Sequence, residues 1–302
     1  MILSPTEMCD KSLRLVSIDA EKRWSKEKRS LIFKEHYGST PLSLAHVWYD
    51  ITVFDFDDSL KLKDFEKEQR GFMMFMVANF YVWTKPKNAG LIAAHFHIGK
   101  DYCQGRPIWI WIERVAALRA KKIVWIRELD DPNAECFIVT IDGTDFKTWE
   151  KKHPTLNLDT GQYTKKHAHG GLKYQVVISM YHQRVVHIHG PCRGGLSDKT
   201  MLTDSGVLGL IKNGKLANVD RGYLNYANKD KLSWPNAQDH PAVNNIKSRG
   251  RLRQESFNGR FSYFKILNDE FRHGTEKHGA AFVMVAVLVQ YSMENGNPLF
   301  SV

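Results

Sequence analysis

The chain has 302 residues, of which 43% are hydrophobic and 25% are charged. These are the proportions of an ordinary globular protein, and they exclude a collagenous, coiled-coil or wholly disordered chain. Lysine and arginine outnumber aspartate and glutamate by 43 to 33, a formal net charge of +10, which favours polyanionic partners such as nucleic acid. The longest apolar stretches are shorter than the roughly 20 residues that cross a bilayer, so we expect no membrane span.

Residues 1–65 form a charged region with weak hydrophobic periodicity, where we expect short, loosely packed helices. Residues 66–125 then read as a helical region, with helices predicted at 72–83, 88–96 and 107–120. The third of these has Pro107 in its first turn and an apolar stripe along one side. A helical trio in a basic protein fits either a helix-turn-helix that reads the DNA major groove or a helical lid packed on the neighbouring domain.

From residue 130 onward the hydrophobic period changes to two, and strands alternate with helices. The β-branched runs predict one strand that ends at Asp142-Gly143, a hairpin, and a short strand that ends at Asp220. We place the strands at 136–141, 173–179, 184–189 and 216–219, and the helices at 197–211, 245–272 and 280–291. This order predicts an α/β fold: an RNase H-like mixed sheet flanked by helices over residues 130–302, with an N-terminal helical region before it.

Three carboxylates stand out in this pattern. Asp142 and Asp220 each follow an apolar strand, and Glu255 lies on the long helix, 35 residues after Asp220. Acids at the ends of neighbouring strands repel one another unless a proton or a metal ion relieves them, and oxygen ligands favour Mg²⁺ or Mn²⁺. Two such ions activate water or a DNA 3′-hydroxyl and stabilise the leaving oxygen of a phosphodiester. Asp145 is an alternative first ligand, and it faces away from Asp142 if the strand continues.

Basic residues surround this acidic centre. Arg251 lies one helical turn before Glu255, where it can hold the carboxylate in place or contact a phosphate. Lys165, Lys166 and Arg221 are further candidates for phosphate contacts. Cations around a group of acids are expected in an enzyme that cuts a polyanion.

Residues 135–302 resemble the DDE-type transposases of the PIF/Harbinger group. The segments that carry the resemblance, in chain order, are IDGTDF (141–146), KHAHGGLKYQVVIS (166–179), HGPCRGGLSD (189–198), VDRGYL (219–224) and RLRQESFNGRFSYFKIL (251–267). The resemblance implies that Asp142, Asp220 and Glu255 bind two divalent ions in an RNase H-like domain. It also implies a nuclear protein, often with a Myb-like DNA-binding helper, and it is compatible with a homo-oligomer.

We therefore predict a metal-dependent DNA endonuclease or transposase that cleaves phosphodiester bonds and joins strands. One alternative is a domesticated DNA-binding or interaction protein that keeps the scaffold without catalysis. A third reading is a nuclease that cuts without strand transfer. A nicking assay with Mg²⁺ distinguishes the first two, and labelled DNA ends reveal whether strands are joined.

Overall fold

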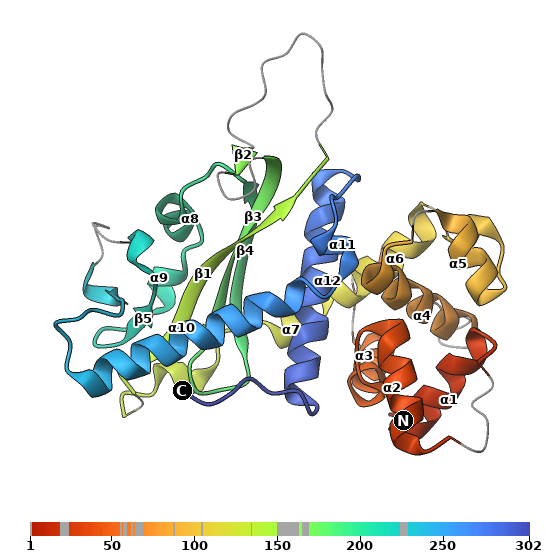
Figure 1. The fold of residues 1–302 in the computed structure, drawn as a ribbon, viewed down its shortest axis with the longest axis horizontal. Coiled ribbons are helices and arrows are strands. Elements are labelled where there is room, and N and C mark those ends of the chain that lie inside the picture. The colour runs from red at the N-terminus through yellow and green to blue at the C-terminus, as the bar shows by residue number, and fades with distance from the viewer. Residues whose placement is uncertain are drawn as a thin grey trace, which may run out of the picture. The chain divides into compact units, whose positions relative to one another are not determined.

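The computed structural model divides into two compact units (Figure 1). Unit 1 comprises residues 1–121, 261–268 and 276–297, and unit 2 comprises residues 122–260, 269–275 and 298–302. The structure describes residues 2–18, 24–54, 56, 59–61, 63, 69–86, 88–103, 105–133, 135–149, 163–164, 169–223 and 229–302. The division differs from the sequence ranges 1–65, 66–125 and 130–302, which remain a prediction, because residues near the C-terminus pack within unit 1.

Helices make up the secondary structure of unit 1 in the residues that the structure describes. They are α1 (Pro5–Leu15), α2 (Lys26–Tyr37), α3 (Pro41–Val53), α4 (Gln69–Thr84), α5 (Ala89–Phe96), η2 (Lys100–Cys103), α6 (Arg106–Ala117), α11 (Lys265–Asn268) and α12 (Thr275–Glu294), and α7 (Arg119–Lys122) leads into unit 2. The helices predicted at 72–83, 88–96, 107–120 and 280–291 are all present, with shifted ends. Within the described ranges, no helix combines the length and the apolar character that crossing a bilayer requires.

The first three helices start at capped N-termini. Ser4, Ser25 and Thr40 each accept a backbone N–H from the residue three positions on, which satisfies a donor that the helix itself leaves unpaired. Behind these caps a few large side chains form a buried core, and the Trp48 ring lies 6.1 Å from that of Trp111. Packing in this region is therefore tighter than its charged sequence suggests.

Helix α6 is a core element of unit 1. Its Arg114 side chain is 3% exposed and donates to the backbone oxygen of Leu60 at 2.8 Å. Arg106 and Glu113 are the exposed residues of this helix. A helix that reads the major groove needs an open polar face, so α6 does not favour the helix-turn-helix interpretation, which stays a prediction for the region 66–125.

Unit 2 is built on a mixed sheet with the order β4-β3-β1-β5-β6, and β2 also pairs with β3. Strand β3 is antiparallel to both β1 and β4, whereas β1, β5 and β6 are parallel. The bounds are β1 (Phe137–Lys147), β2 (Tyr163–Thr164), β3 (His169–Ser179), β4 (Val185–Arg193), β5 (Leu216–Asn218) and β6 (Leu232–Ser233), with short helical turns η3 (Arg127–Asp130), η5 (Arg221–Tyr223) and η6 (Lys229–Lys231). The predicted α/β class, with an RNase H-like mixed sheet flanked by helices, is confirmed.

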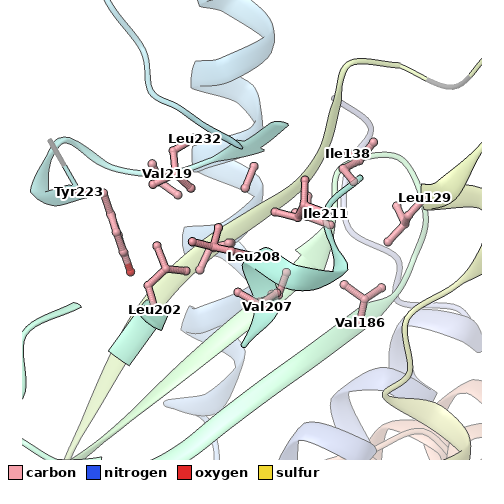
Figure 2. Close-up of a cluster of buried hydrophobic side chains, with 14 residues drawn as sticks. Leu129, Ile138, Val186, Leu202, Val207, Leu208, Ile211, Val219, Tyr223 and Leu232 are labelled. Atoms are coloured by element: carbon pink, nitrogen blue, oxygen red, sulfur yellow. The ribbon is translucent and has the colours of Figure 1, made fainter. Parts of the chain in front are cut away.

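Different helices cover the two faces of this sheet. On one face, β1 and β3 residues such as Ile141 and Val177 join α8 (Asp198–Asp204) and α9 (Val207–Leu210) in a buried apolar cluster. Figure 2 shows this cluster, with Leu202 of α8 and Val207 of α9 labelled. We expected one helix over 197–211, but Gly206 takes a left-handed conformation with φ of 68° and separates α8 from α9. Helix α10 (Pro241–Phe261) crosses the other face (Figure 1).

Helix α10 ends eleven residues earlier than predicted. The expected helix ran from 245 to 272 because the phenylalanines continue at helical spacing, and those residues are indeed buried. Phe271, however, joins the end of β1: its N–H donates to the Lys147 oxygen, and its own oxygen accepts from Trp149. The backbone there serves the sheet and cannot also continue a helix.

Candidate active site

Helix α10 lies close against the sheet because of two features. The Asn218 side chain at the end of β5 donates to the Lys247 oxygen at 2.7 Å. One turn later, a Cβ on Gly250 would come within 2.8 Å of the Asn218 amide and 3.2 Å of a Thr140 methyl carbon. The missing side chain at Gly250 therefore permits a close approach of α10 to β1 and β5. The next residue, Arg251, is the first residue of α10 that belongs to the candidate site.

The predicted acids lie on three elements of unit 2. Asp142 lies inside β1, Asp220 follows β5 by two residues, and Glu255 lies on α10. Arg251 connects two of them: its guanidinium nitrogens lie 3.9 Å from an Asp220 oxygen and 3.7 Å from a Glu255 oxygen. Asp142 accepts a hydrogen bond of 3.0 Å from Asn258 on the same helix. The first acid is thus tied to α10, and the other two are paired with its Arg251.

The electrostatic environment of Asp142 is unfavourable to a carboxylate. Burial raises the pKa of this group from 3.8 to about 6, with further raising by Asp220 and Asp198, while Arg251 and the Gly143 backbone N–H act in the opposite direction. The raised pKa shows that burial and the two acids outweigh Arg251, so this partly buried carboxylate is under-compensated. Perturbed groups of this kind are concentrated at functional sites.

Asp142 does not end its strand, contrary to the prediction from Asp-Gly. Strand β1 continues to Lys147, with Asp142 opposite Val176 and Gly143 opposite Gln175 in the ladder with β3. The Asp-Gly pair looked like a turn, but an eleven-residue partner strand extends the pairing through it. A Cβ on Gly143 would come within 2.7 Å of an Asp198 oxygen, so glycine is what this close approach allows.

The continued strand places Asp145, the alternative first ligand, on the sheet face opposite Asp142. There its carboxylate lies 3.9 Å from the Lys173 ammonium, which is also 3.1 Å from Asp198. Asp145 therefore has the Lys173 ammonium near its carboxylate, and its backbone lies opposite Lys173 in the ladder of β1 and β3. The geometry favours Asp142 over Asp145 as the member of the acidic centre.

Sequence reasoning missed three polar residues near this centre: Asp198, Gln254 and Asn258. Asp198 opens α8 after the N-cap Ser197, and this Ser-Asp pair signals only a helix start. Gln254 and Asn258 share a face of α10 at a spacing of four residues. No local pattern shows that this face meets Asp142.

The four residues predicted to contact phosphate lie in different environments or outside the described residues. Arg251 lies among the acids and Arg221 is exposed in η5, whereas Lys165 and Lys166 lie outside the described residues. Other cations of α10 are structural: Lys247 pairs with Asp239 at 2.8 Å, and the fully buried Arg253 donates to the backbone oxygens of Ser179, His182 and Phe300.

A divalent metal fits the chemistry of this donor set. Asp142, Asp220 and Glu255 supply the oxygen ligands that Mg²⁺ and Mn²⁺ prefer, and a dication would compensate the poorly stabilised Asp142 carboxylate. In the part of the chain that the structure describes, no three His, Cys, Asp or Glu residues are grouped closely enough to hold a metal ion. Arg251 instead provides the positive charge next to Asp220 and Glu255.

Comparison with known proteins gives one family match. The model of a family described as DDE superfamily endonuclease matches residues 141–290, a range that contains all three acids. No curated protein and no solved structure matches the chain. With its mixed sheet and its acids on β1, after β5 and on α10, this part of the chain is similar to a DDE superfamily endonuclease domain.

Proposed function

We propose that this protein is a metal-dependent endonuclease or transposase that cleaves DNA phosphodiester bonds and joins strands. The observation that carries the proposal is that one helix, α10, contacts all three acids: its Arg251 pairs with Asp220 and Glu255, and its Asn258 donates to Asp142. The match to the DDE endonuclease family and the net charge of +10 support a nucleic acid as the substrate.

Asp142, Asp220 and Glu255 would hold two Mg²⁺ or Mn²⁺ ions. When bound, these ions supply Lewis-acid chemistry: they lower the pKa of an attacking water or 3′-hydroxyl and stabilise charge on the leaving oxygen. The three carboxylates would fix where the ions bind and would provide negative charge that offsets theirs. Burial of Asp142 strengthens this attraction, because charges interact more strongly where water is excluded.

Arg251 has two roles in this proposal. In the structure it neutralises Asp220 and Glu255, which lets like charges share one site. With the acids neutralised by bound ions, its guanidinium would be available for a DNA phosphate, which an arginine contacts through two parallel N–H bonds. The exposed Arg221, next to Asp220, is placed to contact the same strand.

The test is nicking of supercoiled DNA in the presence of Mg²⁺ or Mn²⁺. We expect cleavage by the wild type, its loss in Asp220→Ala and its retention in Asp204→Ala, a control that removes an exposed acid of α8. Labelled DNA with free 3′-hydroxyl ends then shows whether strands are joined. Cleavage that survives Asp220→Ala would contradict the assignment of the acids.

Membership of the PIF/Harbinger group, a nuclear location, a Myb-like helper protein and assembly into a homo-oligomer belong to the proposal as well. The motifs from IDGTDF to RLRQESFNGRFSYFKIL support the group. The nuclear location, the helper protein and the homo-oligomer are features that membership of this group implies. Fluorescence microscopy of the tagged chain and sedimentation of the purified protein test location and assembly.

A second candidate function is DNA binding without cleavage. It is favoured by one observation, the Arg251 guanidinium that lies between Asp220 and Glu255, where a catalytic ion is expected. A protein of this kind would bind DNA at every Mg²⁺ and Mn²⁺ concentration and cut it at none. The nicking assay, run beside a DNA-binding measurement, distinguishes the two functions.

A further inference from the structure

A chain of three hydrogen bonds runs from the interior of the sheet to Asp142. The Thr140 hydroxyl donates to Gln254 Oε1 at 2.5 Å, Gln254 Nε2 donates to Asn258 Oδ1 at 3.2 Å, and Asn258 Nδ2 donates to Asp142 Oδ2 at 3.0 Å. Thr140 and Asp142 share one face of β1, and Gln254 and Asn258 share one face of α10. Two of the bonds therefore connect the strand to the helix, and the third connects Gln254 to Asn258 along the helix.

This chain has a single direction. A carboxylate only accepts hydrogen bonds, so Asn258 must turn its N–H₂ group towards Asp142. The Asn258 oxygen then faces Gln254, which must in turn present its own N–H₂ group. The remaining Gln254 oxygen accepts from Thr140, and every member donates towards Asp142.

The inner end of the chain is enclosed. Thr140 is 1% exposed and Gln254 is 2% exposed. The Thr140 hydroxyl therefore has little access to water, and a Gln254 amide without it would leave a buried oxygen unpaired. A buried polar group without a partner loses its hydrogen bonds to water and gains none in return, and this cost holds both amides in one orientation.

We propose that Thr140, Gln254 and Asn258 are positioning residues that fix the Asp142 carboxylate for metal binding. The inference rests on the proposed function. A carboxylate has about four lone-pair sites, so the bond from Asn258 sets its orientation and leaves acceptor capacity for an ion. Partners that orient a metal ligand change metal affinity by about 10–100-fold when they are removed.

The experiment measures Mn²⁺ affinity by calorimetry on the full chain, without DNA. We expect Asn258→Ala to weaken binding by about 10–100-fold and Thr140→Val by about tenfold. Thr140→Ser keeps the hydroxyl and should bind within about twofold of the wild type. Ser256→Ala, an exposed change on the same helix, is the matched control and should leave the affinity unchanged.

The serine and valine variants form the decisive pair, because valine keeps the shape of threonine whereas serine keeps only its hydroxyl. Equal affinity in Thr140→Val and Ser256→Ala, or equal weakening in both Thr140 variants, overturns the positioning role while the metal site stands. A wild type that binds no Mn²⁺ overturns the proposed function and this inference with it. If Asn258→Ala does not fold, the Thr140 pair still decides the question.

A second readout needs no metal. In amide NMR spectra, Thr140→Val should shift the side-chain N–H₂ signals of Asn258, two hydrogen bonds away, and Thr140→Ser should leave them in place. Unchanged Asn258 signals in Thr140→Val would show that the three bonds do not act as one chain.

Discussion

Each unit of the molecule has an inward-facing aspartate, and the two are treated differently. In unit 1, Asp50 of α3 accepts from the Lys121 ammonium at 2.7 Å and from the Tyr291 hydroxyl at 2.5 Å. In unit 2, Asp142 accepts from the neutral amide of Asn258, and burial above all raises its pKa, with Arg251 acting against the shift and Asp220 and Asp198 adding to it. Asp50 has a cation and a hydroxyl in direct contact, whereas Asp142 has an amide in direct contact, with the charges of Arg251, Asp220 and Asp198 around it.

The difference separates a structural acid from a functional one. The partners of Asp50 are Lys121 of α7 and Tyr291 of α12, so this carboxylate connects segments that are far apart in the sequence. Its charge is compensated within the fold. The charge of Asp142 is not, and a carboxylate in that state gains free energy from any cation that reaches it.

The largest expected effect tests this contrast directly. Asp142→Asn keeps the shape of the side chain but removes the charge that attracts a metal ion, so we expect DNA cleavage to fall by about 10³-fold, or about 4 kcal/mol of transition-state stabilisation. Initial nicking rates at saturating Mg²⁺ measure it. Asp50→Asn is the comparison, and its rate per folded molecule should match the wild type. A rate for Asp142→Asn within tenfold of the wild type would contradict the functional role of Asp142.

The pH dependence of stability gives the next effect. Because the pKa of Asp142 rises from 3.8 in the unfolded chain to about 6 in the fold, the folded state binds more protons between pH 4 and 6. The contribution of this group to stability is therefore lost as pH rises through that window, by about 3 kcal/mol. Urea unfolding at pH 4 and pH 7 measures the loss as the difference between wild type and Asp142→Asn.

At pH 7 the variant should be the more stable protein in that comparison, and at pH 4 the gap should close. Added Mg²⁺ should also close the gap at pH 7, because it stabilises the ionised carboxylate of the wild type. A gap that is the same at both pH values would show that Asp142 does not carry the effect.

The third effect concerns the structural acid. Asp50→Ala leaves the buried Tyr291 hydroxyl without its acceptor, and it breaks a pair with Lys121 whose ammonium end is partly exposed. We expect a loss of about 2 kcal/mol in the free energy of unfolding, because the exposed half of the ion pair contributes little. Urea unfolding at pH 7 measures it, with Asp10→Ala, which breaks the half-exposed pair with Arg29, as the control of smaller effect.

Much of the fold could be predicted from the sequence where local patterns carry the information. The hairpin of β3 and β4 and the helices from α4 to α6 are found near their predicted places, because alternation and helical periodicity are local properties. The end of β1 could not be found in this way. Asp142-Gly143 has the composition of a turn, and only pairing with the distant β3 extends the strand through it.

The candidate site shows the same limit. Asp142, Asp220 and Glu255 could be named because acids beside apolar strands are conspicuous, and because the motifs resemble a known family. The basic residues of α10 were harder to interpret, since a count of charges does not distinguish Arg251 among the acids from Arg253, which is buried against backbone oxygens. Tertiary packing alone decides which cation is left for a phosphate.

The smallest expected effect concerns Asp145, which shares β1 with Asp142 and was its rival in the sequence. Asp145→Asn should change the nicking rate by less than about threefold, because its carboxylate lies on the opposite face beside Lys173. The Asp145 and Lys173 side chains are each only 13% exposed, but the Lys173 ammonium keeps Asp198 at 3.1 Å, so the free energy of unfolding should fall by about 1–2 kcal/mol. Nicking rates of Asp145→Asn and Asp142→Asn, measured side by side, give the test. If the Asp145 variant were the slower of the two, the acid with a lysine beside it would be the functional one, and the rule drawn from Asp50 and Asp142 would fail for this protein.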